Sequence, residues 1–257
     1  MWYQIKSRLN FLLKSSNQHG IHSPFVYDLI TKCFYDKTSF SAYHNLKVLR
    51  NELIHNQDLV KIKHYSEASK VFQSNHQKIS TILKDEGSSY KKQKLLYRIT
   101  NYFKPKKVLE LGTSLGLGSA AMAIDSNNII ITTIEVNKNI SAIAKKVFKS
   151  YQLKNIQIDT SSFKDFFKKT NNENLDLVYI DGTYDKKSTI ENFNSLLKYA
   201  HNESVFIFNN IYWSKEMTEA WNIIKKQKEI TVSIDTYYLG FLFFRKEQPK
   251  QHFTIRL

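Results

Sequence analysis

The sequence has little cysteine, little acid in its first half and no long apolar run. Cys33 is the only cysteine among 257 residues, so a disulfide within the chain and a metal cluster built on cysteines are both excluded. No stretch of 18 apolar residues occurs, which argues against a membrane-spanning helix. Lys6, Arg8 and Lys14 interrupt the first apolar segment, so we expect no signal peptide and a cytoplasmic protein.

The shortage of acid is uneven along the chain, whose formal charge is +15. Residues 1–107 carry 19 Lys and Arg against 7 Asp and Glu, whereas residues 108–257 carry 19 against 16. A basic half indicates an anionic partner, such as an acidic small molecule, an acidic lipid surface or nucleic acid. Nucleic acid has the least support of the three, because no RNA-binding signature accompanies the charge.

The first 16 residues, MWYQIKSRLNFLLKSS, contain an apolar stripe at helical spacing with basic flanks. The stripe consists of Trp2, Ile5, Leu9, Leu12 and Leu13. Such a helix can lie on a membrane surface, but most amphipathic helices pack on their own domain. We expect the second arrangement.

The spacing of apolar residues changes near residue 103. Before that point it is helical, with Ser23 and Pro24 as a predicted N-cap and first turn. Pro105 ends the last of these helices. We therefore expect residues 1–103 to form a helical N-terminal extension or lid, and residues 104–257 to form a Rossmann-like domain.

Five strand and helix pairs are expected in the second part. The strands are KVLEL, IIITTIE, IQI, LDLVYID and SVFIF, followed by helices at about 117–126, 138–152, 162–170, 186–200 and 214–228. Alternation of this kind predicts an α/β fold with a doubly wound parallel sheet. The last two strands, ITVSID and YYLGFLFFRK, are joined only by a turn and must pair antiparallel, so the sheet is expected to end in a hairpin.

The run KKVLELGTSLGLGS fits two motifs. One is G-x-S-x-G, the elbow that presents a hydrolase serine, and the other is a glycine-rich nucleotide cradle. In hydrolases the elbow comes after several strands, one of which carries an oxyanion loop. Here the glycine-rich part of the run comes at the end of the first expected strand. The cradle is therefore the favoured interpretation.

The residues around the run indicate which nucleotide it would hold. Gly112 and Gly116 allow tight turns, and Glu135 ends the next strand 23 residues after Gly112, which suits an acid that binds ribose hydroxyls. Glu110 would repel a pyrophosphate but would attract a positively charged ligand. S-adenosylmethionine, with a sulfonium and an ammonium group, is therefore the expected cofactor.

Three segments carry a resemblance to a known family: VLELGTSLGLGSAAMA, TTIEVN and LDLVYIDGTYDKKSTIENFNSLL. They resemble class I S-adenosylmethionine-dependent methyltransferases of the catechol-O-methyltransferase-like branch, whose sheet has seven strands. The segments HGIHSPFVYDLI, NYFKPKKVLELGTSLG, WSKEMTEAW and FFRKEQPKQHFTIRL resemble an uncharacterised bacterial group of methyltransferases with a helical N-terminal extension.

The resemblance implies roles for individual residues. Glu135 would hold the ribose, Ser161 and Ser162 would lie near the adenine, and Asp181 would contact the cofactor at the reaction centre. The methionine end would be lined by Glu110, Gly112, Thr113, Ser114 and Gly116. A serine after a strand also commonly caps the next helix, and this alternative stays open for Ser162.

The chain departs from the family at its candidate metal ligands. The metal-dependent branch holds Mg²⁺ with the acid of the fourth strand and an Asp-Asn or Asp-Asp pair that ends the fifth. The corresponding residues here are Asp181, Asn209 and Asn210, which together bring a single carboxylate. Because Mg²⁺ sites usually use more anionic oxygen, we expect no tightly bound divalent metal.

The candidate catalytic residues are Asp181, Tyr184 and His22. Tyr184 stands where the related group has a histidine, and a phenol with a pKa near 10 is a poor base at neutral pH. His22 would supply an imidazole if the extension folds over the cleft; otherwise it only packs in the turn before the helix. In the segment KHYSEASKV, three residues replace an acid and glycines of the related group and point to a different acceptor: His64, Tyr65 and Glu67.

We therefore expect a methyltransferase that acts on an oxygen or nitrogen of a small or anionic acceptor, and a homo-oligomer is compatible with this. One alternative is a catalytically inactive module that binds the cofactor or a partner, because the cradle is intact while the catalytic positions differ. A second is a nucleic-acid methyltransferase, which rests on the basic half alone.

Overall fold

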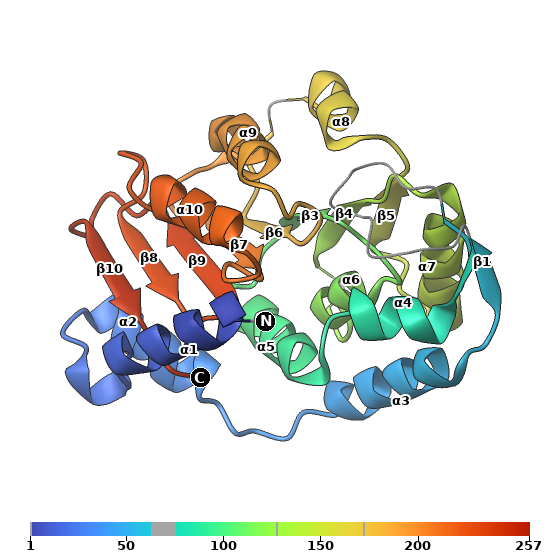
Figure 1. The fold of residues 1–257 in the computed structure, drawn as a ribbon, viewed down its shortest axis with the longest axis horizontal. Helices are drawn as coiled ribbons and strands as arrows, with labels where there is room; N and C mark the ends of the chain where they lie inside the picture. Colours follow the sequence, from blue (N-terminus) through green and yellow to red (C-terminus); the bar gives the residue numbers. More distant parts are fainter. Residues whose placement is uncertain (1, 63–75, 127, 172) are drawn as a thin grey trace. The chain divides into compact units, whose positions relative to one another are not determined.

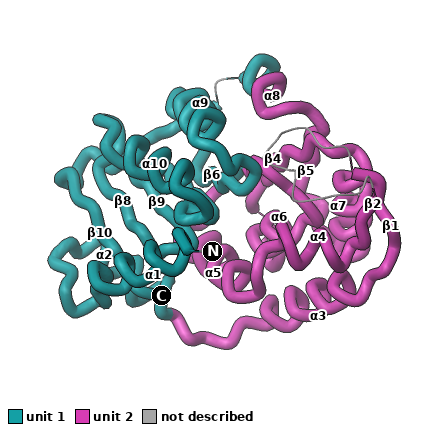
Figure 2. The backbone as a smooth tube through the Cα atoms, viewed as in Figure 1, with its two compact units in different colours: residues 1–35, 107–109, 167–257 teal, residues 36–106, 110–166 magenta. Residues whose placement is uncertain are grey.

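The computed structural model describes residues 2–62, 76–126, 128–171 and 173–257 (Figure 1). The chain forms two compact units, shown in two colours in Figure 2. Unit 1 consists of residues 1–35, 107–109 and 167–257, and unit 2 of residues 36–106 and 110–166. This division by packing differs from the division by periodicity at residues 103 and 104, which stays a prediction.

Unit 1 contains a mixed sheet with the strand order β10-β8-β9-β7-β6-β3. Its strands are β3 (Lys107–Leu111), β6 (Leu177–Ile180), β7 (Val205–Asn209), β8 (Val232–Asp235), β9 (Leu239–Phe243) and β10 (Gln251–Thr254). Strand β9 runs antiparallel between β7 and β8, whereas β6 is parallel to β7 and β10 is parallel to β8. The expected terminal hairpin is thus confirmed.

Helices cover both faces of the unit 1 sheet. They are α2 (Pro24–Leu29) with a π-helical turn at Ile30–Phe34, α9 (Lys186–Leu196) and α10 (Lys215–Ile224); the unit also contains α1 (Trp2–Lys14). Because side chains alternate along a strand, the faces can be told apart in β9. Trp221 of α10 packs over Gly240, while Phe34 of the π-helical turn packs on the other face, with its ring centroid 4.9 Å from that of Phe241.

Unit 2 continues the strand order from β3 through β4 (Ile130–Ile134) and β5 (Ile156–Asp159), which run parallel. Its helices are α3 (Ala42–His55), α4 (Ile79–Asp85), α5 (Tyr90–Phe103), α6 (Leu117–Ala123) and α7 (Lys138–Ser150), and α8 (Phe163–Lys169) begins in it. Side chains of α3 and α4 share one apolar core with α6 and α7, among them Leu49, Ile82, Ala120 and Phe148. The segment before β3 therefore braces the helices that follow β3 and β4.

The main differences from the expected fold are short strands. The sheet has eight strands instead of seven, because the polar segment Gln251–Thr254 adds β10 at the edge. An antiparallel pair, β1 (Leu59–Lys61) and β2 (His76–Lys78), lies within the region expected to be helical. Three- and four-residue strands with few apolar side chains give no periodic signal.

Within the described residues, no helix is both long enough and apolar enough to cross a bilayer.

We predict that Gly240→Ala destabilises the protein by about 1–3 kcal/mol, the usual cost of overpacking a core. A Cβ at this position would lie 2.7 Å from two ring carbons of Trp221, which is buried and rigid. Urea unfolding of the variant measures the loss. Gly20→Ala is the control, because its Cβ would meet Ser16 at an ordinary 3.5 Å and should change stability little. Equal midpoints for Gly240→Ala and wild type would contradict the packing described here.

Candidate functional site

The glycine-rich run forms a tight turn between β3 and α6. Three of its residues have positive φ angles: Gly112 at 100°, Ser114 at 47° and Gly116 at 84°. The backbone N–H groups of Gly112 and Thr113 both donate to the carbonyl oxygen of Ile134, at 3.0 and 3.1 Å. The turn is therefore tied to the carboxyl end of β4, and α6 begins directly after it.

Gly116 stands at the N-terminus of α6, against α7. A Cβ on Gly116 would lie 2.6 Å from a ring carbon of Phe148 and 3.4 Å from the Cβ of Ala144. Glycine is required here twice, for its left-handed backbone and for this close approach. The contact brings α6 and α7 together behind the turn.

Glu110 lies beneath the turn and is 1% exposed. Its Oε2 accepts hydrogen bonds from the hydroxyl groups of Ser119 and of Thr133, the latter at 2.6 Å. The hydroxyl oxygens of Thr133 and Thr113 also lie 2.6 Å apart. This buried network connects β3, the turn, α6 and β4, and it places the charge of Glu110 below the cradle.

Glu135 follows β4 and is held by backbone groups on both sides. One carboxylate oxygen accepts from the N–H of Ser114 at 3.0 Å and the other from the N–H of Asn137 at 2.9 Å. Burial raises the pKa of Glu135, and the two N–H donors oppose that rise. The acid predicted to bind ribose is thus fixed beside the glycine turn.

Three buried polar atoms near these strand ends have no hydrogen-bond partner among the described residues. They are Ser114 Oγ after β3, Asn137 Nδ2 after β4 and Ser161 Oγ after β5. Buried polar groups are nearly always paired in folded proteins, so unpaired ones need an explanation such as a ligand. An adenosyl group and an amino acid offer donors and acceptors of this kind, so the residues present fit the expected cofactor.

Ser162 has a structural role. Its Oγ accepts from the N–H of Asp165 at 3.1 Å and donates to the carboxylate of Asp165 at 2.7 Å, in the first turn of α8. The helix-capping alternative is confirmed for this residue, and a contact with adenine stays a prediction.

A second polar group lies in unit 1, at the carboxyl ends of β6 and β7. The carboxylate of Asp181 accepts from Tyr179 at 3.0 Å, from Tyr184 at 3.4 Å and from the amide nitrogen of Asn209. Trp213 lies beside Tyr184 with its ring centroid 5.8 Å away, and its side chain is about half exposed. The cluster combines one carboxylate, two phenols and an exposed indole.

Protein hydrogen-bond donors occupy the carboxylate of Asp181 in this cluster. Asn209 directs its amide nitrogen, not its carbonyl oxygen, toward Asp181, and three donors already occupy the carboxylate. Among the described residues, no group of three His, Cys, Asp or Glu side chains is placed to hold a metal ion. Asn210 adopts a positive φ of 54° in the next turn, where its N–H donates to the carbonyl oxygen of Tyr238 at 2.7 Å.

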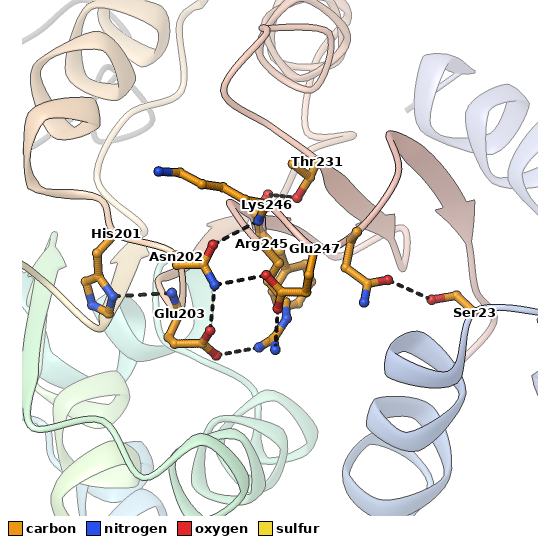
Figure 3. Close-up of polar contacts among 10 residues, drawn as sticks. Ser23, His201, Asn202, Glu203, Thr231, Arg245, Lys246 and Glu247 are labelled. Atoms are coloured by element: carbon orange, nitrogen blue, oxygen red, sulfur yellow. Dashed lines mark hydrogen bonds and ion pairs between the residues drawn. The ribbon is translucent and has the colours of Figure 1, made fainter.

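His22 lies elsewhere in unit 1. Its side chain is exposed, and the neighbouring Ser23 caps α2 and lies 3.5 Å from Gln248 in the loop after β9 (Figure 3). Phe25 packs on Phe243, the last residue of β9, with ring centroids 5.0 Å apart.

The strand register shows how far this segment is from the acid. Phe243 pairs with Val205, the first residue of β7. Asp181 instead follows Ile180, which pairs with Phe208 near the last residue of β7. The histidine therefore lies at the opposite end of the sheet, and the structure does not bring it to Asp181.

Ion pairs join two loops at that opposite end of the sheet (Figure 3). Arg245 contacts Glu203 at 2.5 Å and Glu247 at 2.6 Å, and Asn202 donates to both carboxylates at 2.8 and 3.0 Å. These contacts join the loop before β7 to the loop after β9, which is a structural role.

Some expectations were incomplete. Sequence reasoning did not identify Ser119, Thr133 and Asn137 as residues of the site. A threonine inside the apolar run IIITTIE was a usable signal, because its buried hydroxyl needs a polar partner. His64, Tyr65 and Glu67 lie outside the described residues, so their expected place in an acceptor pocket stays a prediction.

A comparison with protein-family models identifies the family. A family model described as O-methyltransferase matches residues 61–235. No sequence among the curated proteins searched matches the chain.

Solved structures of methyltransferases share the fold. An O-methyltransferase from Bacillus cereus in complex with SAH has a TM-score of 0.57 at 14% identity, covering 85% of this chain and 96% of that one. The SAM complex of TomG from Streptomyces achromogenes, an O-methyltransferase involved in tomaymycin synthesis, has 0.56 at 14%, covering 81% and 91%. SAH-bound PaMTH1 from Podospora anserina has 0.60 at 12%, covering 88% and 97%.

We predict that Gly116→Ala lowers the free energy of unfolding by about 2 kcal/mol or more, through backbone strain and overlap with Phe148. Phe148→Leu in the same chain removes the overlapping ring atoms but not the strain. The double variant should therefore lose about 1 kcal/mol less free energy of unfolding than the two single variants lose together. Urea unfolding of all four proteins completes the cycle, and additive losses would show that the ring and the glycine do not oppose each other.

Proposed function

Because the chain belongs to the O-methyltransferase family and is an S-adenosylmethionine-dependent methyltransferase, we propose that its cradle at residues 110–162 holds the cofactor and that Asp181 serves the acceptor. The acceptor would be a small molecule methylated on a hydroxyl oxygen. One observation carries the proposal: unpaired buried polar atoms follow β3, β4 and β5, beside an acid fixed by two N–H groups.

The proposed cofactor contacts follow the chemistry of each residue. Glu135 is a carboxylate with spare acceptor capacity for ribose hydroxyls, and Ser161 offers its unpaired hydroxyl to the adenine end. The residues proposed for the methionine end are Gly112, Thr113, Ser114 and Gly116. Glu110 lies buried beneath the turn, and its negative charge would attract the sulfonium and ammonium groups of the cofactor.

When bound, S-adenosylmethionine would supply the methyl group from its positively charged sulfur: the bond from the acceptor oxygen to the methyl carbon would form as the carbon–sulfur bond breaks, with S-adenosylhomocysteine as the leaving group. Asp181 would accept the hydrogen bond of the acceptor hydroxyl and take its proton as the new bond to carbon forms. The hydrogen bonds from Tyr179, Tyr184 and Asn209 stabilise the charged form of Asp181, so its main contribution is to orient the hydroxyl. Trp213 and Tyr184 provide flat apolar surface for an aromatic acceptor.

We also propose that the reaction needs no divalent cation. In a metal-dependent enzyme of this kind, the cation neutralises the acceptor oxygen as its proton leaves. Here neutral donors surround the one carboxylate, and a metal ion would have to displace them.

We predict that S-adenosylhomocysteine binds with a Kd that agrees within about twofold in EDTA and in excess Mg²⁺, because the residues proposed to hold it include no metal ligand. Glu135→Ala should weaken binding at least about tenfold, through loss of the hydrogen bonds to both ribose hydroxyls. Asp58→Ala, which removes an exposed acid of the same unit, should leave the Kd unchanged.

Isothermal titration of the three proteins, with NAD as a ligand control, checks both statements. Binding that disappears in EDTA would overturn the metal-independent proposal. Unchanged affinity in Glu135→Ala would overturn the assignment of the ribose acid, and preference for NAD would overturn the cofactor.

A further inference from the structure

The first helix, α1, is attached to unit 1 by one side only. Tyr3, Ser7 and Phe11 follow one another at a spacing of four and face the unit. Phe11 is 2% exposed, and its ring centroid lies 5.4 Å from that of Tyr237 and 6.4 Å from that of Tyr212. In Figure 1, α1 lies across the ends to which the arrows of β8 and β10 point.

The opposite side of α1 is apolar and open. Its exposed fractions are 80% for Trp2, 48% for Ile5, 59% for Leu9 and 86% for Leu13, within the part of the chain that the structure describes. Single exposed apolar residues are ordinary, but four in one line along a helix form a continuous stripe of the kind that marks an interaction site. The helix thus docks on its own domain as expected, but it does so through Ser7 and Phe11 and not through this stripe.

Two further aromatic side chains adjoin the helix. Gln4 donates to the carbonyl oxygen of Trp213 at 3.2 Å, and the Arg8 guanidinium lies 5.5 Å from the ring centroid of Tyr238. Trp213 and Tyr238 are 47% and 53% exposed. Tryptophan and tyrosine in such half-exposed positions are typical of the boundary between water and lipid.

The side of α1 next to the stripe is basic. Lys6, Asn10 and Lys14 follow at a spacing of four and line a cavity of about 500 Å³, together with Lys215 and Lys225. The first acidic residue of the chain comes only at position 28.

The acids near the cavity are already engaged. Asp235 lines it, but its carboxylate accepts from Tyr212 at 2.7 Å and from the N–H of Tyr237 at 2.9 Å. Lys215 lies 4.0 Å from Glu219 and keeps a side chain that is 81% exposed. Lys6, Lys14 and the largely exposed Lys215 therefore all contribute positive charge on this side of the helix.

We propose that α1 docks this protein on the surface of a membrane that contains anionic phospholipids. The apolar line would enter the boundary between headgroups and acyl chains, and the lysines beside it would contact lipid phosphates. This inference goes beyond the proposed acceptor chemistry and rests mainly on the apolar line of α1 and on the lysines beside it.

Two other occupants satisfy fewer of these features. A second copy of the chain could cover the apolar line in a two-fold contact, but its α1 would bring no acidic side chain to Lys6 and Lys14. A nucleic acid could neutralise the lysines, but its phosphate backbone offers nothing to Leu9 and Leu13. An anionic bilayer pairs with both rows.

Vesicle sedimentation of the full chain tests the proposal. We expect binding to vesicles of phosphatidylcholine with about one third phosphatidylglycerol, weak binding to pure phosphatidylcholine, and a decline as salt is raised. The exposed double variant Leu9→Gln/Leu13→Gln and the charge variant Lys6→Glu/Lys14→Glu should each lower partitioning at least about tenfold.

Matched controls separate this surface from general stickiness. Leu59→Gln removes an exposed apolar side chain of unit 2, and Lys145→Glu/Lys146→Glu makes the same change in net charge on α7. Both should bind vesicles like the wild type, and circular dichroism should show all four variants folded.

Several outcomes would overturn the proposal. They are equal binding to neutral and anionic vesicles, no binding to either, and equal losses in test and control variants. A dimer in analytical ultracentrifugation that Leu9→Gln/Leu13→Gln abolishes, together with no vesicle binding, would assign the stripe to a second copy instead.

Discussion

The buried carboxylate of Glu110 is the constraint on which the cradle depends. Removing a carboxylate from water is costly unless hydrogen bonds replace the lost hydration, and here hydroxyl groups of Ser119 and Thr133 provide them. Those two residues belong to α6 and β4, so meeting the needs of one acid fixes a strand, a helix and the neighbouring strand together. Thr113 joins the same network through Thr133, which sets the shape of the glycine turn. The charge expected to serve a ligand thus also organises the site.

The cradle and the cluster around Asp181 differ in how far the protein itself satisfies the hydrogen bonds of their polar atoms. Around the cradle, hydroxyl and amide atoms of Ser114, Asn137 and Ser161 are buried without partners, so a ligand that pairs with them would remove an existing cost. Asp181 is the opposite case, because several protein donors already reach its carboxylate. The first site is thus prepared for strong binding. The second is suited to holding a hydroxyl in a fixed direction, which is enough when the methyl donor is intrinsically reactive.

Sequence reasoning was most successful where burial leaves a strong pattern. The apolar strands, the glycine turn and Glu135 could all be located, because parallel strands are almost continuously apolar and positive φ angles require particular residues. It failed for β10, which is short, polar and at the edge of the sheet. It also misjudged which side of α1 is buried, because the helix is apolar on two sides and periodicity cannot tell them apart. The position of His22 depends on strand register, which one sequence does not reveal.

The composition of unit 1 has a consequence for how the protein is made. Ser16 forms a bridge with Ile255 and accepts from the N–H of Arg256, so the first segment of the chain joins the last. Unit 2 lies entirely between residues 36 and 166 and can assemble while synthesis continues. The early segment must wait for strands that emerge more than two hundred residues later, which is a contact of very high sequence separation and a slow one to form. During that interval the apolar side chains on both faces of α1 stay exposed on the nascent chain.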